Sequence, residues 1–257
     1  MTKEEVLDAL RHAKISPGDC IMIHGDSAVA FQLKEHNMDK KLSLLFKLIL
    51  NYIGKEGTLV VPTFTYSATN NEIFDVKNTT SKVGYFSEFF RNIPGVLRSS
   101  HPIFSVAAYG KYKEIFANSS LKECFGKNSS FDLLHTLDGK IMNLGCSFDF
   151  ITYAHYVEEK LKVKYRYYKK FKGAIKKDAS LIKKTTRYFV GDRSINYKLD
   201  LSKLKEKLII ENKLKIVPFG RFACFTVSCH DFFNTSRNSI KSDEYFLIRE
   251  NSIKQKK

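Results

Sequence analysis

The clearest chemical pattern in the chain is a histidine and a glutamate that lie three residues apart. Thr152, His155 and Glu158 follow one another at intervals of three, so on a helix they share one face. Glu158 can accept the proton of one imidazole nitrogen, which orients the ring and leaves the other nitrogen basic. Such a base can deprotonate an ammonium or hydroxyl group before that group attacks an electrophile. Spacing alone also allows an ordinary histidine–glutamate pair on a helix surface.

A second group of polar residues precedes an apolar stretch of small side chains. Arg98, Ser99, Ser100, His101 and Pro102 are followed by Ser105 and then by two alanines. A charged, hydroxyl-rich turn at this place indicates an anion bound near a tight backbone. An ordinary turn stabilised by Arg98 would show the same pattern.

Polar loops also follow three of the strands that we expect. These loops are residues 24–27, 62–65 and 145–149, and they contain Gly, Ser, Thr, Asp and His. The carboxyl ends of strands in α/β sheets are the usual place for ligands. No glycine-rich dinucleotide fingerprint or P-loop pattern occurs, so any phosphate would be held by amides and hydroxyls. The histidines are dispersed and form no metal-binding motif, so no metal is expected.

The elements that must position these residues alternate between helix and strand early in the chain, while strands dominate later. We expect helices at residues 3–14, 39–53, 84–92, 152–163 and 201–212, and strands at 20–24, 57–62, 104–109, 140–145, 171–175, 185–190 and 216–222. This order predicts an α/β or α+β fold. We expect one domain over residues 1–257, with a basic peripheral insertion around 160–215.

The composition excludes several classes of protein. The chain has 257 residues, of which 43% are hydrophobic, with 21 Phe and 13 Tyr, which is too apolar for a disordered chain. No apolar stretch reaches the roughly 18 residues that span a bilayer. Residues 1–5 resemble a helix capping box rather than a signal peptide. Five cysteines without a CxxC pair indicate neither disulfides nor zinc, so we expect a reduced, cytoplasmic setting.

The net charge of +16 leaves the kind of partner open. Lysines concentrate in residues 160–184, 203–215 and 254–257, which would suit nucleic acid, a membrane surface or a phosphate-bearing small molecule. Runs of charge are also typical of solvated faces. No pattern of a nucleic-acid-binding module is present, so neither nucleic acid nor membrane is an expected partner.

Taken in order, these residues resemble the aminoglycoside 3-N-acetyltransferase family. The resemblance spans about 200 residues in family order, and its most specific parts are the Arg-Ser-x-His-Pro and Thr-x-x-His-x-x-Glu segments. The matching segments are residues 24–27, 57–65, 74–75, 79–84, 90–91, 98–102 with Ser105, 126–129, 144–145, 152–158 and 220–221. The resemblance implies the acyl-coenzyme A-dependent fold of that family, with a central mixed sheet flanked by helices.

The resemblance also implies a role for each matched residue. His155, oriented by Glu158 and sharing its face with Thr152, would remove a proton from an acceptor amine, which attacks the thioester of acetyl-CoA or another acyl-CoA. No metal is needed, because a thioester is already activated. The residues implied for the coenzyme A pocket are Ser27, Thr63, Thr65, Arg98, Ser99, His101 and Ser105, and those for the acceptor are Asp26, Tyr66, Asp75 and Arg166. The expected partners are the amine and the acyl-CoA, with a homodimer as one assembly.

Departures from the family pattern bear on the acceptor. The two serines that usually follow the first strand's histidine are replaced by Gly25-Asp26-Ser27, and Ser130 stands where a proline is common. Aminoglycosides are polycations that need an acidic pocket, whereas residues 164–170 are basic and aromatic. We therefore expect an amino sugar linked to a nucleotide diphosphate. The alternatives are an aminoglycoside 3-N-acetyltransferase that confers antibiotic resistance, and a non-catalytic binder of nucleic acid or anionic surfaces.

Overall fold

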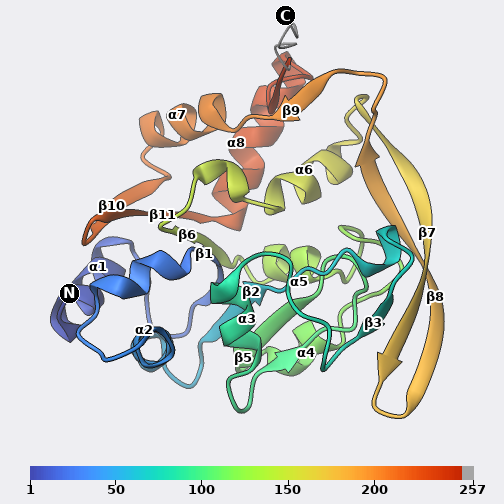
Figure 1. The fold of residues 1–257 in the computed structure, drawn as a ribbon. Helices are drawn as coiled ribbons and strands as arrows, with labels where there is room; N and C mark the ends of the chain where they lie inside the picture. The colour runs from blue at the N-terminus through green and yellow to red at the C-terminus, as the bar shows by residue number, and fades with distance from the viewer. Residues whose placement is uncertain (251–257) are drawn as a thin grey trace, which may run out of the picture.

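The centre of the molecule is a seven-stranded sheet (Figure 1) in a computed structural model that describes residues 1–250; residues 251–257, with the terminal lysines, lie outside the described part. The strand order is β10-β11-β6-β1-β2-β5-β4. The strands are β1 (Cys20–Gly25), β2 (Thr58–Pro62), β4 (Leu97–Arg98), β5 (Val106–Gly110), β6 (Lys140–Leu144), β10 (Lys215–Phe219) and β11 (Phe222–Ser228). β1 runs parallel to β2 and β6, and the other pairs are antiparallel. The predicted mixed sheet is therefore confirmed.

Helices cover both faces of this sheet, because its central strands are buried on both sides. Along β1, Ile21 and Ile23 belong to one hydrophobic core, whereas Cys20 and Met22 belong to the other, as expected for a period of two. The first core is covered by α1 (Lys3–His12), α2 (Met38–Ile53) and α3 (Tyr85–Arg91). The second core is covered by α4 (Lys113–Ala117), α5 (Ser130–Thr136), α6 (Tyr153–Leu161), α7 (Ser202–Ile210) and α8 (Cys229–Ser242).

Local sequence signals fix several helix ends. Thr2 and Glu5 form the capping box expected at the start of α1. At the start of α2, the Lys40 amide donates to the Asn37 side chain at 2.9 Å, and the helix ends at Gly54 with φ of +69°, a conformation that favours glycine. The expected bounds of these two helices therefore differ from the observed ones by no more than two residues.

A long hairpin forms a second sheet at the edge of the molecule. β7 (Arg166–Lys177) and β8 (Ser180–Gly191) are antiparallel, and the short strand β3 (Ile73–Asp75) pairs in parallel with β7. The hairpin follows the right-hand edge of the view in Figure 1. The sequence predicted only residues 171–175 and 185–190 of these two strands, because lysines interrupt any hydrophobic pattern in the rest. β9 (Tyr197–Leu199) and β12 (Ile248–Glu250) form a separate pair.

Some elements differ from the sequence-based expectation. The predicted strand 216–222 is two strands, because the chain turns at Gly220, whose φ is +59°. The sequence analysis did not predict α4, α5 or α8. Within residues 1–250, no helix is both long and apolar enough to cross a bilayer.

Each of the three central strands leads, at its carboxyl end, toward a short 3₁₀ helix. η1 (Ser27–Gln32) follows β1, η2 (Ser67–Thr69) follows β2, and η3 (Phe148–Phe150) follows β6. Since β1, β2 and β6 are parallel, their carboxyl ends meet at one edge. The polar loops that the sequence singled out are thereby brought together.

Candidate active site

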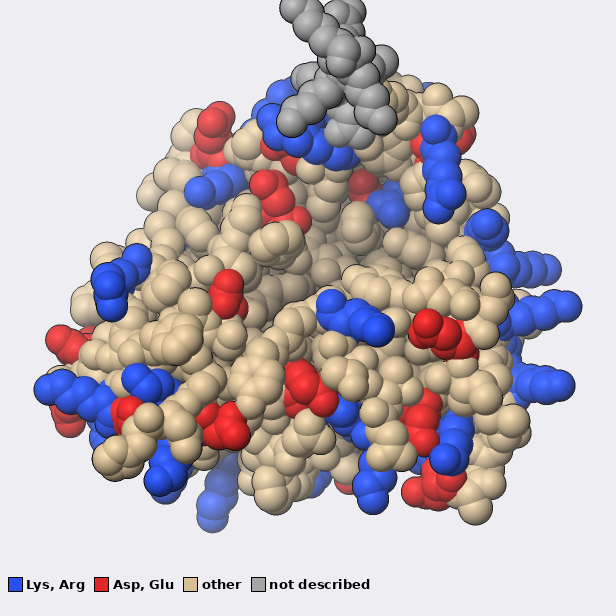
Figure 2. All heavy atoms as spheres, viewed as in Figure 1, with Lys and Arg blue, Asp and Glu red and all other residues tan. Residues whose placement is uncertain are grey.

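A pocket of about 430 Å³ lies at the carboxyl ends of the central strands. Figure 2 shows this face of the molecule hollowed below α6, with mostly uncharged atoms inside the hollow. The pocket is lined by His24, Gly25, Asp26, Ser27, Pro62, Phe64, Tyr66, Val83, Gly84, Tyr85, Phe86, Ser87, Cys146, Phe150 and Thr152. Four predicted site residues, Asp26, Ser27, Tyr66 and Thr152, are therefore brought to one cavity.

The loop after β1 is ordered by its own side chains. The Ala28 amide donates to Asp26 Oδ1 at 2.8 Å, which caps η1. Gly25 lies so close to Phe86 that an added Cβ would be 2.6 Å from the phenyl ring. A serine at position 25 would therefore require Phe86 to move, which gives the departure from the family's two serines a packing reason.

His24 lies in the pocket wall as a neutral ring. The Thr152 amide donates to its Nε2 at 3.5 Å, and its Nδ1 is buried without a partner among the described residues. Burial lowers the pKa of His24 to about 4. His24 therefore carries no charge at neutral pH, and it links the end of β1 to the start of α6.

The histidine and glutamate of α6 are in contact, as their spacing predicts. His155 Nδ1 lies 2.6 Å from Glu158 Oε2. The Glu158 side chain is fully buried, and Tyr165 donates its hydroxyl to the other carboxylate oxygen at 3.0 Å. The His155 side chain keeps 22% of its surface exposed. The carboxylate thus fixes one side of a ring whose other side remains accessible.

Burial and charge act in opposite directions on this pair. Burial of His155 and the nearby positive charge of Arg166 lower its pKa, and the Glu158 carboxylate offsets this only in part. Burial acts to raise the pKa of Glu158, but Arg166 and His155 outweigh it and the pKa is lowered. At neutral pH the arrangement is a neutral imidazole beside an ionised carboxylate, which is the state that a general base needs.

Arg166 does not occupy the surface position expected of a residue that binds the acceptor. Its side chain is only 6% exposed and forms an ion pair with Glu158. Arg166 Nε donates to the carbonyl of Phe189 at 3.0 Å, and Nη1 lies 2.6 Å from His155 Nδ1. Because its donors face the protein, Arg166 belongs with the histidine–glutamate pair rather than on an exposed anion-binding surface.

A series of contacts between aromatic rings leads from the pocket to His155. Tyr66, which lines the pocket, contacts Phe104 with ring centroids 5.8 Å apart. Phe104 contacts Phe125 at 5.0 Å, and Phe125 contacts the ring of His155 at 5.8 Å. Phe104 and Phe125 are buried, so these contacts run through the core. His155 itself is not among the residues that line the pocket, whereas Thr152, three residues earlier in the chain, is.

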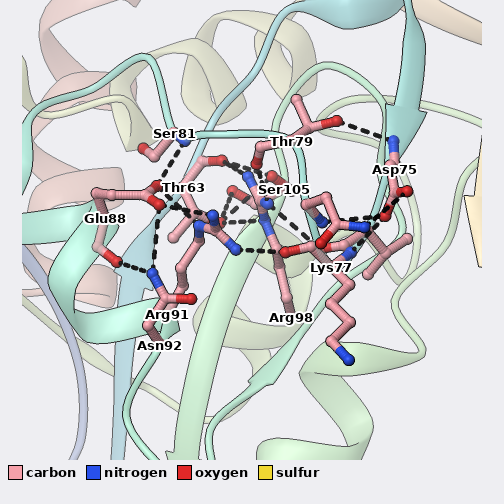
Figure 3. Close-up of polar contacts among 12 residues, drawn as sticks. Thr63, Asp75, Lys77, Thr79, Ser81, Glu88, Arg91, Asn92, Arg98 and Ser105 are labelled. Atoms are coloured by element: carbon pink, nitrogen blue, oxygen red, sulfur yellow. Dashed lines mark hydrogen bonds and ion pairs between the residues drawn. The ribbon is translucent and has the colours of Figure 1, made fainter.

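Arg98 is enclosed by neutral acceptors, as Figure 3 shows. It donates to the hydroxyl of Thr63 at 3.2 Å, to the carbonyl of Thr63 at 2.8 Å, and to the carbonyls of Thr79 and Val76 at 2.6 and 3.3 Å. Burial lowers the pKa of Arg98 to about 9. All three of its nitrogens are used to fasten two loops to each other, so we assign Arg98 a structural part instead of the expected contact with coenzyme A.

The hydroxyl residues next to Arg98 lie beneath the pocket rather than on its surface. Thr63, Thr65, Ser99, His101 and Ser105 are at most 3% exposed. They bond within the protein: Ser105 donates to the Thr63 carbonyl at 2.6 Å, Ser67 to Thr65 at 3.0 Å, the Val106 amide to Ser99 at 3.0 Å and the Phe104 amide to His101 Nδ1 at 3.0 Å. His101 Nε2 is buried without a partner among the described residues. None of the five is among the residues that line the pocket, so the expectation that all five line a coenzyme A pocket does not fit these positions.

Asp75 also has a local role. Its carboxylate accepts from the Lys77 and Asn78 amides at 3.1 and 3.0 Å and pairs with Lys176 at 3.2 Å. Hydrogen bonds from Asn78 lower the pKa of Asp75 to about 2. The residue closes the turn after β3 and does not line the pocket.

The sequence analysis did not predict one side of the pocket, nor the tyrosine that donates a hydrogen bond to Glu158. Val83, Gly84, Tyr85, Phe86 and Ser87 form the wall at the start of α3. The family-like segment 79–84 was a signal for this wall, but it carries no catalytic residue type. Tyr165 had no signal of its own, because it stands in a basic aromatic stretch.

Within residues 1–250, no three His, Cys, Asp or Glu side chains form a group that could hold a metal.

Comparison with known proteins identifies the family. The family model of aminoglycoside 3-N-acetyltransferases matches residues 22–241. The chain belongs to this family. The predicted family is thereby confirmed, together with its class of enzyme, the N-acetyltransferases. Membership of this family supports the alternative acceptor, an aminoglycoside, better than the expected nucleotide-linked amino sugar.

Two curated relatives illustrate the likeness in sequence. Aminoglycoside N(3)-acetyltransferase IV from Salmonella is 28% identical over 165 residues, which cover 63% of this chain and 60% of the relative. A prophage-derived aminoglycoside N(3')-acetyltransferase-like protein, YokD, from Bacillus subtilis is 21% identical over 248 residues, covering 87% and 86%. The match thus spans less than two thirds of the first relative and most of the second.

Solved structures show the same fold. AAC-IIIb in a binary complex with CoASH has a TM-score of 0.79 at 18% identity, covering 94% of this chain and 97% of that one. AAC-VIa bound to sisomicin has a TM-score of 0.78 at 18% identity, covering 94% and 98%. The predicted fold is confirmed, and the first complex agrees with the predicted acyl-CoA co-substrate.

Proposed function

We propose that this chain transfers an acetyl group from acetyl-CoA to an amino group of an aminoglycoside, with His155 as the general base. The observation that supports this most directly is the contact between His155 Nδ1 and Glu158, which leaves Nε2 of a partly exposed ring available for a proton. Thr152, three residues before His155, lines the pocket. This acceptor takes the place of the nucleotide-linked amino sugar.

The reaction needs one substitution at carbon and a proton moved from nitrogen to sulfur. His155 Nε2 takes a proton from the amine, and the amine nitrogen forms a bond with the thioester carbonyl carbon. The carbon–sulfur bond then breaks, the imidazolium gives its proton to the departing sulfur, and coenzyme A leaves as a free thiol while an amide remains. Glu158 stabilises the imidazolium that forms, because its buried, ionised carboxylate accepts a hydrogen bond from Nδ1–H. No covalent enzyme intermediate is required.

The pocket suits an uncharged thioester arm. Its described lining contains one carboxylate, Asp26, and no Lys or Arg. The hydroxyls of Ser27 and Thr152 belong to that lining and are the donors that we propose for the developing charge on the thioester oxygen.

The distribution of charge answers the long-range part of the earlier objection to a polycationic acceptor. Residues 166–191 contain nine Lys or Arg and a single Asp, and they form the β7–β8 hairpin. Figure 2 shows lysine and arginine side chains projecting from the right-hand edge, where β7 and β8 lie in Figure 1. Much of the net charge of +16 is thus displaced from the hollow, and exposed charges beyond about 10 Å are screened at 0.1 M salt.

The test is a thiol-release assay with acetyl-CoA and two panels of amines. We expect turnover with one or more aminoglycosides, none with nucleotide-linked amino sugars, and little with His155→Ala. The matched control is His36→Ala, a histidine in the loop between η1 and α2 that lies outside the pocket lining; it should keep wild-type turnover. Thiol release with no aminoglycoside, or salt-sensitive oligonucleotide binding in place of turnover, would overturn the proposal.

A further inference from the structure

Two groups of opposite kind lie at the same distance from one nitrogen. Glu158 Oε2 and Arg166 Nη1 are each 2.6 Å from His155 Nδ1. A carboxylate can only accept a hydrogen bond and a guanidinium can only donate one. A ring nitrogen carries either a proton or a lone pair, so only one of these two contacts can be a hydrogen bond at a time.

The choice between them decides whether His155 is a base. When Nδ1 carries the proton and donates to Glu158, Nε2 has a lone pair and can accept a proton. When Nδ1 accepts from Arg166, the proton of the neutral ring is on Nε2, which then cannot act as a base. The placement of one guanidinium therefore bears on the tautomer of the ring.

The structure ties Arg166 to the carboxylate rather than to the ring. Arg166 Nη1 bonds Glu158 Oε2, and Nε donates to the carbonyl of Phe189 at 3.0 Å. Arg166 is also the first residue of β7, where it pairs with Gly191. Backbone pairing, a carbonyl and a carboxylate thus fix the guanidinium, so that Glu158 stays ionised and available to Nδ1.

The positive charge of Arg166 has a second effect on the ring. The charged groups that act on His155 are Glu158 from its own helix and Arg166 from β7. Phenols from neighbouring segments also surround the pair, and burial raises the pKa of each of them, which leaves them uncharged: Tyr165, Tyr188 and Tyr197. A buried glutamate alone would favour an imidazolium, whereas Arg166 opposes it.

We propose that Arg166 is the positioning residue of this site: it holds Glu158 toward Nδ1 and, by its charge, keeps His155 neutral until the amine arrives. The proposal rests on the function proposed above, because the base matters only if a proton is transferred. The arginine joins the basic hairpin to the catalytic pair, so the hairpin contributes one residue to the chemistry.

The kinetic test compares three variants across pH. Arg166→Met should lower kcat at pH 7 by about 10- to 100-fold, because without the charge of the guanidinium most of the His155 rings are protonated at this pH. The acid limb of its kcat/KM profile should move to higher pH, and the loss should shrink to within about threefold near pH 9, because the imidazolium then loses its proton. Arg166→Lys keeps the charge and should keep the acid limb. Arg187→Met, the same change at an exposed arginine of β8 paired with Glu123, should match the wild type.

A second measurement separates this proposal from the proposed function. Titration of the His155 imidazole by NMR, assigned with His155→Ala, needs no substrate and no turnover. We expect a higher His155 pKa in Arg166→Met than in the wild type and in Arg187→Met. An unchanged His155 pKa in folded Arg166→Met, or an equal loss of kcat at every pH, would overturn the role of Arg166. A wild type that releases no thiol, with the NMR shift present, would overturn the proposed function alone.

Discussion

Two partly buried arginines in this molecule have opposite surroundings. Arg98 faces four neutral oxygens, and burial lowers its pKa to about 9. Arg166 faces a buried carboxylate; burial acts to lower its pKa, but Glu158 outweighs this effect and the pKa is raised. The comparison shows that a buried guanidinium can fasten loops through its donors or act on a neighbouring base through its charge. Its partners, rather than its burial, decide which.

The first prediction tests whether the residues in contact with Arg166, His155 and Glu158, carry out the proton transfer. His155→Ala should lower kcat by about 10²–10⁴-fold, the usual contribution of a general base, since no other group contacts the acceptor proton in the proposed mechanism. Glu158→Gln should lose less, because it removes only the orientation and stabilisation of the ring. Thiol release at saturating amine measures both. Near-wild-type turnover of His155→Ala would place the chemistry elsewhere.

The second prediction concerns the structural arginine. Arg98→Met leaves the carbonyls of Thr63, Thr79 and Val76 without this donor, so the free energy of unfolding should fall by about 3 kcal/mol. Tm should fall by roughly 6–12 °C in a chain of this size, as read by scanning calorimetry. Turnover per folded molecule should stay within about threefold of the wild type. A loss of turnover with an unchanged Tm would make Arg98 a ligand contact after all.

The third prediction examines the hydroxyl that Arg98 holds. Thr63 accepts from Arg98 and donates to the Ser105 carbonyl at 3.1 Å, so Thr63→Val should cost about 1–2 kcal/mol of stability. Since Thr63 is fully buried, the KM for acetyl-CoA should change by less than about twofold. Urea unfolding and initial rates provide the two readouts. A large rise in that KM at constant stability would return Thr63 to the coenzyme A pocket.

The fourth prediction follows from the lowered pKa of His155. The neutral imidazole is the active form, so kcat/KM should fall as pH decreases through the pKa of His155 in the folded protein. Burial and Arg166 place that pKa below the ordinary value of 6.5, and the acid limb should therefore lie below pH 6.5. Glu158→Gln should move the limb further down, because the carboxylate is the group that raises this pKa. A limb above pH 7 would contradict the assignment.

The smallest effect is expected on the exposed face of the hairpin. Lys170 and Lys172 are exposed on β7, and changing both to Ala should alter kcat/KM for an aminoglycoside by less than about twofold at 0.1 M salt. Initial rates at two salt concentrations measure this. A large gain or loss would show that the hairpin charge reaches the acceptor.

The pattern of residues predicted the local parts of the site well. The interval of three between His155 and Glu158 gives their contact, and the polar loops after three strands give the position of the pocket, because both depend on helix and sheet periodicity. The helices with clear caps were predicted for the same reason. What the sequence could not show is which side of a loop faces the cavity, as for Thr63 and Ser105.

Long-range partners account for the rest. Arg98 bonds Thr63, which lies 35 residues earlier in the chain. Arg166 is only eight residues from Glu158, but their contact depends on the path of the chain between α6 and β7, for which the sequence has no periodic signal. Such contacts depend on tertiary packing, so the sequence placed both arginines on ligands. The net charge favoured an anionic acceptor for a similar reason, because a total charge does not show where on the surface the lysines lie.

The strand order has a consequence for how the protein is made. β1 can pair with β2 early in synthesis, whereas its other neighbour, β6, is made much later. β6 pairs in turn with β11, at residues 222–228. Pairings so distant in sequence fold slowly, and until they form, apolar strand edges stay open to association with other chains. The pocket, which requires β1, β2 and β6 together, is complete only when most of the chain has left the ribosome. Chaperone dependence and yield should therefore respond more to changes in β6 and β11 than to changes in the hairpin.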